Sequence, residues 1–208
     1  MITIVDYKAG NLTSVRLAFE HLGAEVEITD RPEPILAASR VVFPGVGAAC
    51  ASMENLRRLG VLDPLREVVR RGTPFLGICI GMQLLFDRSE EDGGTSCTAL
   101  VPGEVRRFRP SDPMCKIPQI GWNAVSFRRN HPLLAGVESE SELYFVHSFY
   151  PAPADPSHIV GETDYAGIRF ASIVARGNLF ATQFHPEKSG RIGLKILGNF
   201  LVWDGKEG

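Results

Sequence analysis

A cysteine between two glycines is the first feature of this sequence that could do chemistry. Cys79 lies in segment 76–83, where a strand-like apolar run meets a helix-like one, with Gly77 and Gly81 on either side. The pattern is the cysteine counterpart of the Gly-x-Ser-x-Gly nucleophile elbow, a turn too tight for side chains beside the nucleophile. It would hold a sulfur at the first turn of a helix, where the dipole favours a thiolate. A buried structural cysteine at a glycine-rich strand end accounts for the same five residues equally well.

A histidine followed by a carboxylate forms the second chemical segment. His185 and Glu187 end a strand-like run, and residues two apart in an extended chain point to the same side. Pro186 disfavours the α region for His185, so Glu187 can orient the imidazole. A histidine held by a carboxylate is the general base that a thiol nucleophile needs. A surface turn would explain these residues alone, but together with Cys79 they predict a Cys-His-Glu triad for acyl transfer.

Acyl transfer also needs donors for the oxyanion, and a glycine-containing loop could supply them. Pro44-Gly45-Val46-Gly47 follows a predicted strand, at the edge of a parallel sheet where loops converge. Its glycines let backbone N–H groups turn toward a ligand. A dinucleotide-binding loop is the rival interpretation. We set it aside because Cys50 stands where that motif has its third glycine and the loop follows the wrong strand.

Alternating strand-like and helix-like segments must position these residues. Helices are predicted where apolar residues recur three and four apart, and strands where apolar runs are short and continuous. The predicted strands are 2–6, 24–29, 40–43 and 74–78, and the predicted helices run from an Asn11 cap to Gly23, from Met53 to about Gly72 in two pieces, and through 82–86. Buried strands that alternate with helices indicate a parallel, doubly wound α/β sheet.

The second half of the chain has a different pattern. Between residues 103 and 185 several strand-like runs alternate with turns rich in Pro, Gly, Asn and Asp, which indicates an antiparallel extension of the same sheet. A last helix is expected over about 190–203. Because no repeat, low-complexity segment or linker divides the sequence, we expect one domain over 1–208.

Composition excludes several classes of protein. The chain carries 22 Lys and Arg against 24 Asp and Glu, a net charge of −2, so it has no basic field for nucleic acid or an anionic membrane. The four cysteines are widely spaced, which argues against a zinc site or a disulfide framework. Apolar stretches are far shorter than the ~20 residues of a membrane span, and Met1 leads directly into a predicted strand without a signal-peptide pattern. We therefore expect a cytoplasmic protein.

The Cys79 segment, the His-Pro-Glu segment and the 44–47 loop together resemble those of class I, or triad, glutamine amidotransferases, over essentially the whole chain. This resemblance implies a flavodoxin-like α/β sheet with an antiparallel extension. It also implies hydrolysis of glutamine to glutamate and ammonia through a cysteinyl thioester, without a metal or cofactor.

Less general segments narrow the resemblance. Segments 6–11, 44–47, 116–123, 144–149 and 185–190 are similar to those of the glutaminase subunits of imidazole glycerol phosphate synthases. The departures are Gln119-Ile120, where His-Met is expected, and Phe149, where tyrosine is more usual. The narrower resemblance implies a heterodimer with a (β/α)8-barrel cyclase. That partner would use the ammonia to make imidazole glycerol phosphate and an aminoimidazole carboxamide ribonucleotide in histidine biosynthesis.

The resemblance also implies a role for each candidate residue. Glu91 and Gln83 suit the ammonium and carboxylate groups of an α-amino acid, although a solvated acidic run and a solvated helix residue would account for them without it. In the triad, Cys79 would be the nucleophile, His185 the base and acid, and Glu187 the orienting carboxylate. Val46 and Ile80 would donate to the oxyanion, and glutamine would be bound by Gly47, Gln83, Glu91, Ser148 and Phe149. The partner interface or the ammonia path would include Asn11, Trp122, Tyr144 and Lys188.

Two other classes of protein remain open at this point. One is a different triad enzyme, either the glutaminase subunit of another amidotransferase or a cysteine hydrolase that acts alone. The other is an inactive scaffold, against which the intact triad argues. In the glutaminase interpretation an unattended site would waste glutamine, so hydrolysis should depend on the partner. The 44–47 loop is the predicted switch, because turning the Val46 N–H toward the site would add an oxyanion donor worth about 10²–10³ in rate.

Overall fold

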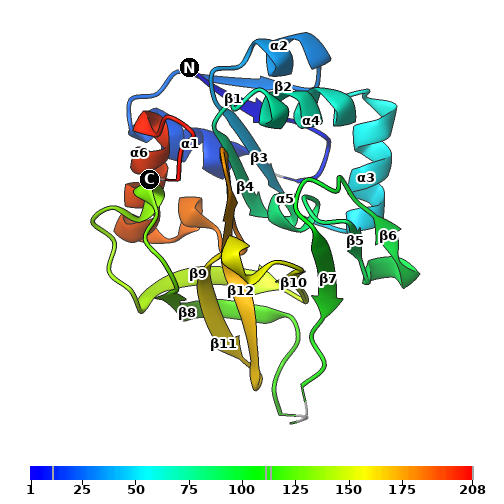
Figure 1. Ribbon diagram of the computed structural model, residues 1–208, viewed down its shortest axis with the longest axis vertical. Helices are drawn as coiled ribbons and strands as arrows, with labels where there is room; N and C mark the ends of the chain where they lie inside the picture. The colour runs from blue at the N-terminus through cyan, green and yellow to red at the C-terminus, as the bar shows by residue number, and fades with distance from the viewer. Residues whose placement is uncertain (11, 111, 113, 208) are drawn as a thin grey trace.

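The computed structural model describes residues 1–10, 12–110, 112 and 114–207, and its main feature is a sheet that is parallel in one half and antiparallel in the other (Figure 1). The strand order is β2-β1-β3-β4-β13-β12-β11-β8-β9. The parallel strands are β1 (Ile2–Val5), β2 (Val26–Thr29), β3 (Val41–Gly45), β4 (Phe75–Cys79) and β13 (Leu179–Thr182). All but β2, at the edge, are buried along their whole length, which is typical of a parallel sheet covered on both faces.

Helices cover both faces of the parallel half (Figure 1). One apolar cluster joins α1 (Thr13–His21) and α6 (Gly190–Val202) to the strands, through Phe19 and Phe200 among others. A second cluster on the other face joins α2 (Pro32–Ala37), α3 (Ala49–Arg58) and α4 (Leu62–Arg70). Because alternate strand residues enter the two clusters, the predicted doubly wound arrangement is confirmed.

The antiparallel half extends the sheet beyond β13, as predicted. It consists of β12 (Ile168–Arg176), β11 (Ile159–Tyr165), β8 (Gln119–Phe127) and β9 (Ser141–His147). A smaller sheet has the order β10 (Phe149–Pro153), β7 (Gly103–Arg107), β5 (Arg88–Ser89) and β6 (Thr95–Ser96). Short 3₁₀ turns lie at Glu91–Gly93, Pro132–Leu134, Pro156–His158 and Pro186–Lys188.

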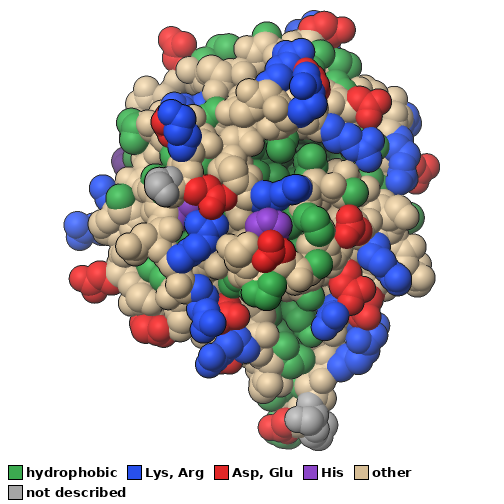
Figure 2. Space-filling view, in the orientation of Figure 1, with side chains coloured by type: hydrophobic (Ala, Val, Ile, Leu, Met, Phe, Trp, Pro, Cys, Tyr) green, Lys and Arg blue, Asp and Glu red, His purple; other side chains and the backbone are tan. Residues whose placement is uncertain are grey.

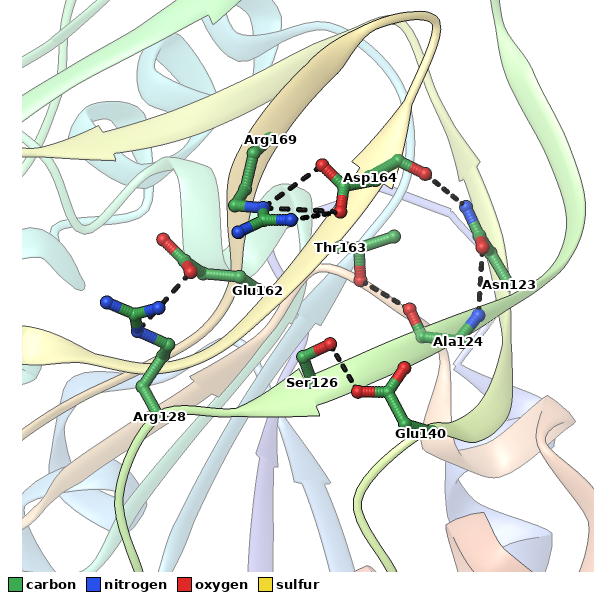
Figure 3. Close-up of polar contacts among 9 residues, drawn as sticks. All are labelled: Asn123, Ala124, Ser126, Arg128, Glu140, Glu162, Thr163, Asp164 and Arg169. Atoms are coloured by element: carbon green, nitrogen blue, oxygen red, sulfur yellow. Dashed lines mark hydrogen bonds and ion pairs between the residues drawn. The ribbon is translucent and has the colours of Figure 1, made fainter.

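Side-chain hydrogen bonds brace β8 where its ladder with β11 ends (Figure 3). The Asn123 side-chain amide donates to the Asp164 carbonyl at 3.0 Å, and the Thr163 hydroxyl donates to the Ala124 carbonyl at 3.0 Å. Arg169 on β12 forms an ion pair with Asp164 on β11, at 2.8 Å. The two hydrogen bonds hold β8 in place next to Trp122, one of the residues predicted to meet a partner.

The helix after Cys79 is shorter than predicted. α5 spans only Ile80–Gln83 and is followed by a turn, whereas the apolar pattern predicts a helix through 82–86. The reason is competition for carbonyls: the backbone N–H groups of residues 98–101 donate to the carbonyls of Leu84, Leu85 and Phe86, at 2.8–2.9 Å. α2 was not predicted at all, and the Asn11 cap lies outside the described residues.

Candidate functional site

Cys79 lies on a strained turn between β4 and α5. Its φ of 56° and ψ of −111° fall in a region that non-glycine residues rarely adopt, and such strain is concentrated at functional sites. A Cβ on Gly81 would collide with the Phe43 carbonyl, and one on Gly77 would lie 3.0 Å from the Ala181 Cβ. This is the tight turn that the glycine spacing predicts, and it points the sulfur away from the strand axis.

His185 and Glu187 follow β13, the neighbour of β4 in the sheet. The Nδ1 atom of His185 lies 2.8 Å from Glu187 Oε1, and the two side chains are only 3% and 4% exposed. A carboxylate can only accept, so Nδ1 carries a proton and the buried Nε2 is left to interact with Cys79. Burial favours the neutral imidazole, but interactions with Cys79 and Glu187 outweigh it and raise the pKa of His185 to about 10.

A cavity of about 290 Å³ opens beside the sulfur. This volume is near the lower end of the roughly 300–1,000 Å³ found for small-molecule sites, and it suits a small amino acid. The predicted substrate-binding and oxyanion residues all line this cavity: Val46, Gly47, Ile80, Gln83, Glu91, Ser148 and Phe149. Pro118, Val146 and His147 also line it. The structure therefore brings residues from five separate segments to one pocket at Cys79.

Two polar side chains of the pocket are held by the backbone. Gln83 donates its Nε2 to the Phe149 carbonyl at 2.9 Å. Glu91 Oε2 accepts from the Ala49 N–H, the first amide of α3, at 2.6 Å. Burial raises the pKa of Glu91, since it disfavours a carboxylate that lacks a cationic partner. A ligand ammonium group would supply that partner.

The loop predicted to supply an oxyanion donor holds its N–H away from the sulfur. The Val46 N–H donates to the Ala9 carbonyl at 2.9 Å. Ile80 N–H is the first amide of α5, and first-turn amides have no acceptor inside their helix. In this conformation Ile80 can serve as a donor, while Val46 can do so only after its peptide turns.

Two of the residues predicted to meet a partner, Trp122 and Tyr144, lie on neighbouring strands, β8 and β9. Trp122 is 54% exposed, and its ring centroid lies 6.0 Å from that of Tyr144, its cross-strand partner. Ile120 is 64% exposed and pairs with Val146 on the same face. Lys188 is exposed next to Glu187, and Asn11 lies outside the described residues. Charges of both signs are interspersed over the face drawn in Figure 2.

Backbone contacts join this face to the triad. The His185 N–H donates to the Tyr144 carbonyl at 2.9 Å, and the Tyr144 N–H donates to Ser189 Oγ at 3.0 Å. Ser189 Oγ in turn donates to the His185 carbonyl at 2.7 Å. A shift of β9 would therefore move His185 directly.

Sequence reasoning missed Pro118 and Val146, which line the pocket. It also missed Gln183, which contacts Cys79. Gln183 is completely buried, its Nε2 lies 3.7 Å from Cys79 Sγ, and its Oε1 accepts from Gln83 at 2.9 Å. A signal existed, because Gln183 precedes His185 by two residues and an extended chain places both on the same side. His147, interpreted as an ordinary strand histidine, bonds the Phe149 carbonyl through Nδ1 at 2.7 Å.

The described residues contain neither a cluster of metal ligands nor a helix that could span a membrane. No group of three or more His, Cys, Asp or Glu side chains in the described ranges is arranged to hold a metal ion. No helix in that part of the chain is long and apolar enough to cross a membrane.

The chain is similar in sequence to one protein family over nearly its whole length. The family Glutamine amidotransferase class-I matches residues 3–203. An imidazole glycerol phosphate synthase subunit HisH from Chloroflexus aurantiacus is 49% identical over 98% of this chain and 96% of its own length. The HisH subunit of Methylococcus capsulatus is also 49% identical, with the same coverage of both chains.

Solved structures are similar in fold. A crystal structure of a glutamine amidotransferase superposes with a TM-score of 0.74 at 16% identity and covers 97% of this chain and 100% of its own. PurLQS from Thermotoga maritima gives a TM-score of 0.72 at 20% identity, with 96% of each chain covered. At these identities the likeness shows the fold alone, whereas the full-length relatives at 49% identity show the family. The chain belongs to the class-I glutamine amidotransferases and, among them, to the HisH subunits of imidazole glycerol phosphate synthase.

Proposed function

We propose that this protein hydrolyses glutamine to glutamate and ammonia at Cys79 and delivers the ammonia to a cyclase subunit of imidazole glycerol phosphate synthase. The single observation that carries the proposal is the buried His185–Glu187 pair next to Cys79, whose side chain lines a pocket sized for an amino acid. Membership in the HisH family supports the identity of the synthase and its place in histidine biosynthesis.

The chemistry begins with a proton transfer inside the triad. His185 Nε2 takes the thiol proton, and Glu187 stabilises the resulting imidazolium through Nδ1–H. The raised pKa of His185 means that the imidazole keeps this proton at neutral pH. The thiolate attacks the amide carbon of glutamine, and the imidazolium then protonates the nitrogen that leaves as ammonia. Water attacks the thioester with His185 as base, which releases glutamate and restores the thiol.

The pocket supplies groups of the right type for the rest of the substrate. Glu91 and the free Oε1 atom of Gln83 would accept from the α-ammonium group, and the backbone around Gly47, Ser148 and Phe149 would hold the α-carboxylate. The negative charge of the tetrahedral intermediate would lie near the Ile80 N–H. The Val46 N–H would join it after the Gly45–Val46 peptide turns away from Ala9, which makes the 44–47 loop the proposed switch.

The exposed face of β8 and β9 is the proposed cyclase interface. Ile120 and Trp122 are large apolar side chains more than half exposed, and such neighbouring side chains on a strand are typical of a binding surface. Because Tyr144 is bonded to both His185 and Ser189, docking on this face would reach the triad through two hydrogen bonds. We expect the partner to be a (β/α)8-barrel cyclase and Lys188 to form an ion pair with an acidic residue of it.

The test is a pair of assays on the reconstituted synthase. Cys79→Ala should abolish glutamine-dependent synthesis but leave ammonia-dependent synthesis unchanged, because only thioester formation uses the sulfur. Cys50→Ala, at an exposed cysteine, is the matched control and should leave both activities unchanged. Glutamine-dependent turnover by Cys79→Ala would refute the assignment of the nucleophile. A separate growth test uses a strain from which the gene for this protein has been deleted. If the wild-type gene does not restore growth of this strain without histidine, the assignment to imidazole glycerol phosphate synthase is refuted.

A further inference from the structure

Two buried amides, Gln83 and Gln183, form a hydrogen-bonded chain between the pocket and the nucleophile. Gln183 follows β13 and has no exposed surface. Its Oε1 accepts from Gln83 Nε2 at 2.9 Å, and its own Nε2 lies 3.7 Å from Cys79 Sγ. A backbone hydrogen bond from the Gln183 N–H to the Ser172 carbonyl, at 2.9 Å, fixes the position of the residue.

The direction of this chain is set by an atom that can only accept, the Phe149 carbonyl. It receives His147 Nδ1 at 2.7 Å and Gln83 Nε2 at 2.9 Å, so Gln83 must turn its NH₂ group toward it. The same NH₂ group reaches Gln183, which must therefore present its oxygen to Gln83. The NH₂ group of Gln183 is left to face the sulfur. One carbonyl thus determines the orientation of both amides.

We propose that Gln183 is a positioning residue that donates an N–H to Cys79 Sγ and favours the thiolate. A donor is attracted more strongly to an anion than to a neutral thiol. Besides His185, the sulfur also lies 3.8 Å from the Val146 carbonyl, an acceptor that favours the protonated thiol. Gln183 therefore opposes Val146, and it also links the nucleophile to Gln83, a residue of the proposed glutamine site.

Gln183 and His185 act on the sulfur from one strand end. They are two residues apart, and both side chains are buried next to Cys79. His185 would take the proton, while Gln183 would hold the sulfur and stabilise its charge after the proton leaves. This inference rests on the proposed role of Cys79 as the nucleophile.

The experiment measures the rate at which iodoacetamide alkylates Cys79 as a function of pH, in the full-length chain. Mass spectrometry of the Cys79 peptide separates this thiol from the other three cysteines. Gln183→Met keeps the size and removes both polar groups. Gln183→Glu keeps the acceptor for Gln83 but replaces the donor to sulfur by a carboxylate oxygen, whose negative charge also disfavours the thiolate. A hydrogen bond to a charged group corresponds to about one to two pH units, so Gln183→Met should move the alkylation midpoint upward by that amount and Gln183→Glu by at least as much.

The matched control is Thr182→Val, at the last residue of β13 and next to Gln183. Thr182 is equally buried and loses a hydrogen bond to the Phe184 carbonyl, but its side chain points to the opposite face. It should leave the midpoint unchanged. Gln183→Met decides the matter if Gln183→Glu does not fold. A Gln183→Met profile that superimposes on the wild type, or an equal shift in Thr182→Val, would overturn the proposal. Alkylation requires neither glutamine nor a partner, so these outcomes are independent of whether the proposed synthase activity is found.

Discussion

Val46→Gly should activate the isolated chain. For the Val46 N–H to leave Ala9 and face the sulfur, the peptide between Gly45 and Val46 must turn over. Such a turn rotates ψ of Gly45 and φ of Val46 by about half a turn, and Val46 does not have a positive φ in this structure. Glycine accepts the new φ freely, whereas a β-branched residue is strained there. The valine itself therefore helps to keep the loop in its inactive state.

The size of the effect follows from that strain. A non-glycine residue in the left-handed region costs roughly 1–2 kcal/mol, and each 1.36 kcal/mol is tenfold in an equilibrium or a rate. The hydrogen bond to Ala9, at 2.9 Å, must be broken in wild type and variant alike and cancels. Val46 is 43% exposed, so truncation removes little core packing. If the active conformation is rare, glutaminase activity of the isolated chain should rise about 5–30-fold.

The assay is steady-state glutamine hydrolysis by the isolated chain and by the synthase with a ligand in the cyclase site. The wild type and Val46→Gly reach the same active loop in the ligand-bound synthase, so their rates there should agree. The ratio of the ligand-bound rate to the basal rate should therefore fall by the factor by which the basal rate of Val46→Gly rises. Val46→Ala is the matched control: it removes the exposed methyl groups but keeps the Cβ that causes the strain. No rise in Val46→Gly, or an equal rise in Val46→Ala, would refute the reasoning.

Two further predictions concern the triad and the acid stability of the fold. Glu187→Gln keeps the shape of the side chain and removes its charge, so the loss of glutaminase kcat should be about two orders of magnitude smaller than for Cys79→Ala. Ammonia-dependent synthesis should be unchanged. A loss of kcat equal to that of Cys79→Ala would contradict an orienting role for Glu187. Burial lowers the pKa of His147 and of His131 from 6.5 to about 4, so the unfolded chain binds protons first and stability falls as pH drops through this window. His147→Asn can still donate to the Phe149 carbonyl, and it should remove up to ~3 kcal/mol of the loss in unfolding free energy between neutral and acid pH, as measured by urea unfolding. If the unfolding free energy of the variant depends on pH as in the wild type, His147 is not the group responsible.

The parallel half of the fold could be predicted because its signals are local. Continuous buried strands such as β4 and the three-and-four spacing of Val15 and Phe19 in α1 are visible within a few residues. The order of strands could not be predicted in this way. β13 pairs with β4, although about a hundred residues separate them, and no local pattern specifies that partner. The length of α5 failed for the same reason, since residues 98–101 end it from a distance.

The proximity of Cys79, His185 and Glu187 was predictable from residue types and spacing, but the direction of the Val46 N–H was not. Val46 N–H has two acceptor environments, Ala9 in this structure and the oxyanion of a substrate intermediate, and a sequence does not say which one is occupied. The sequence does not determine the direction of the Gln183 amide either, because this direction depends on the carbonyl of Phe149, 34 positions away in the chain. What the site does therefore follows from the directions of a few hydrogen bonds: a carbonyl that can only accept turns Gln183 toward the sulfur, while another turns Val46 away from it. In the proposed mechanism the first contact favours the thiolate and the second withholds an oxyanion donor, so a partner would need to move only one peptide to start hydrolysis.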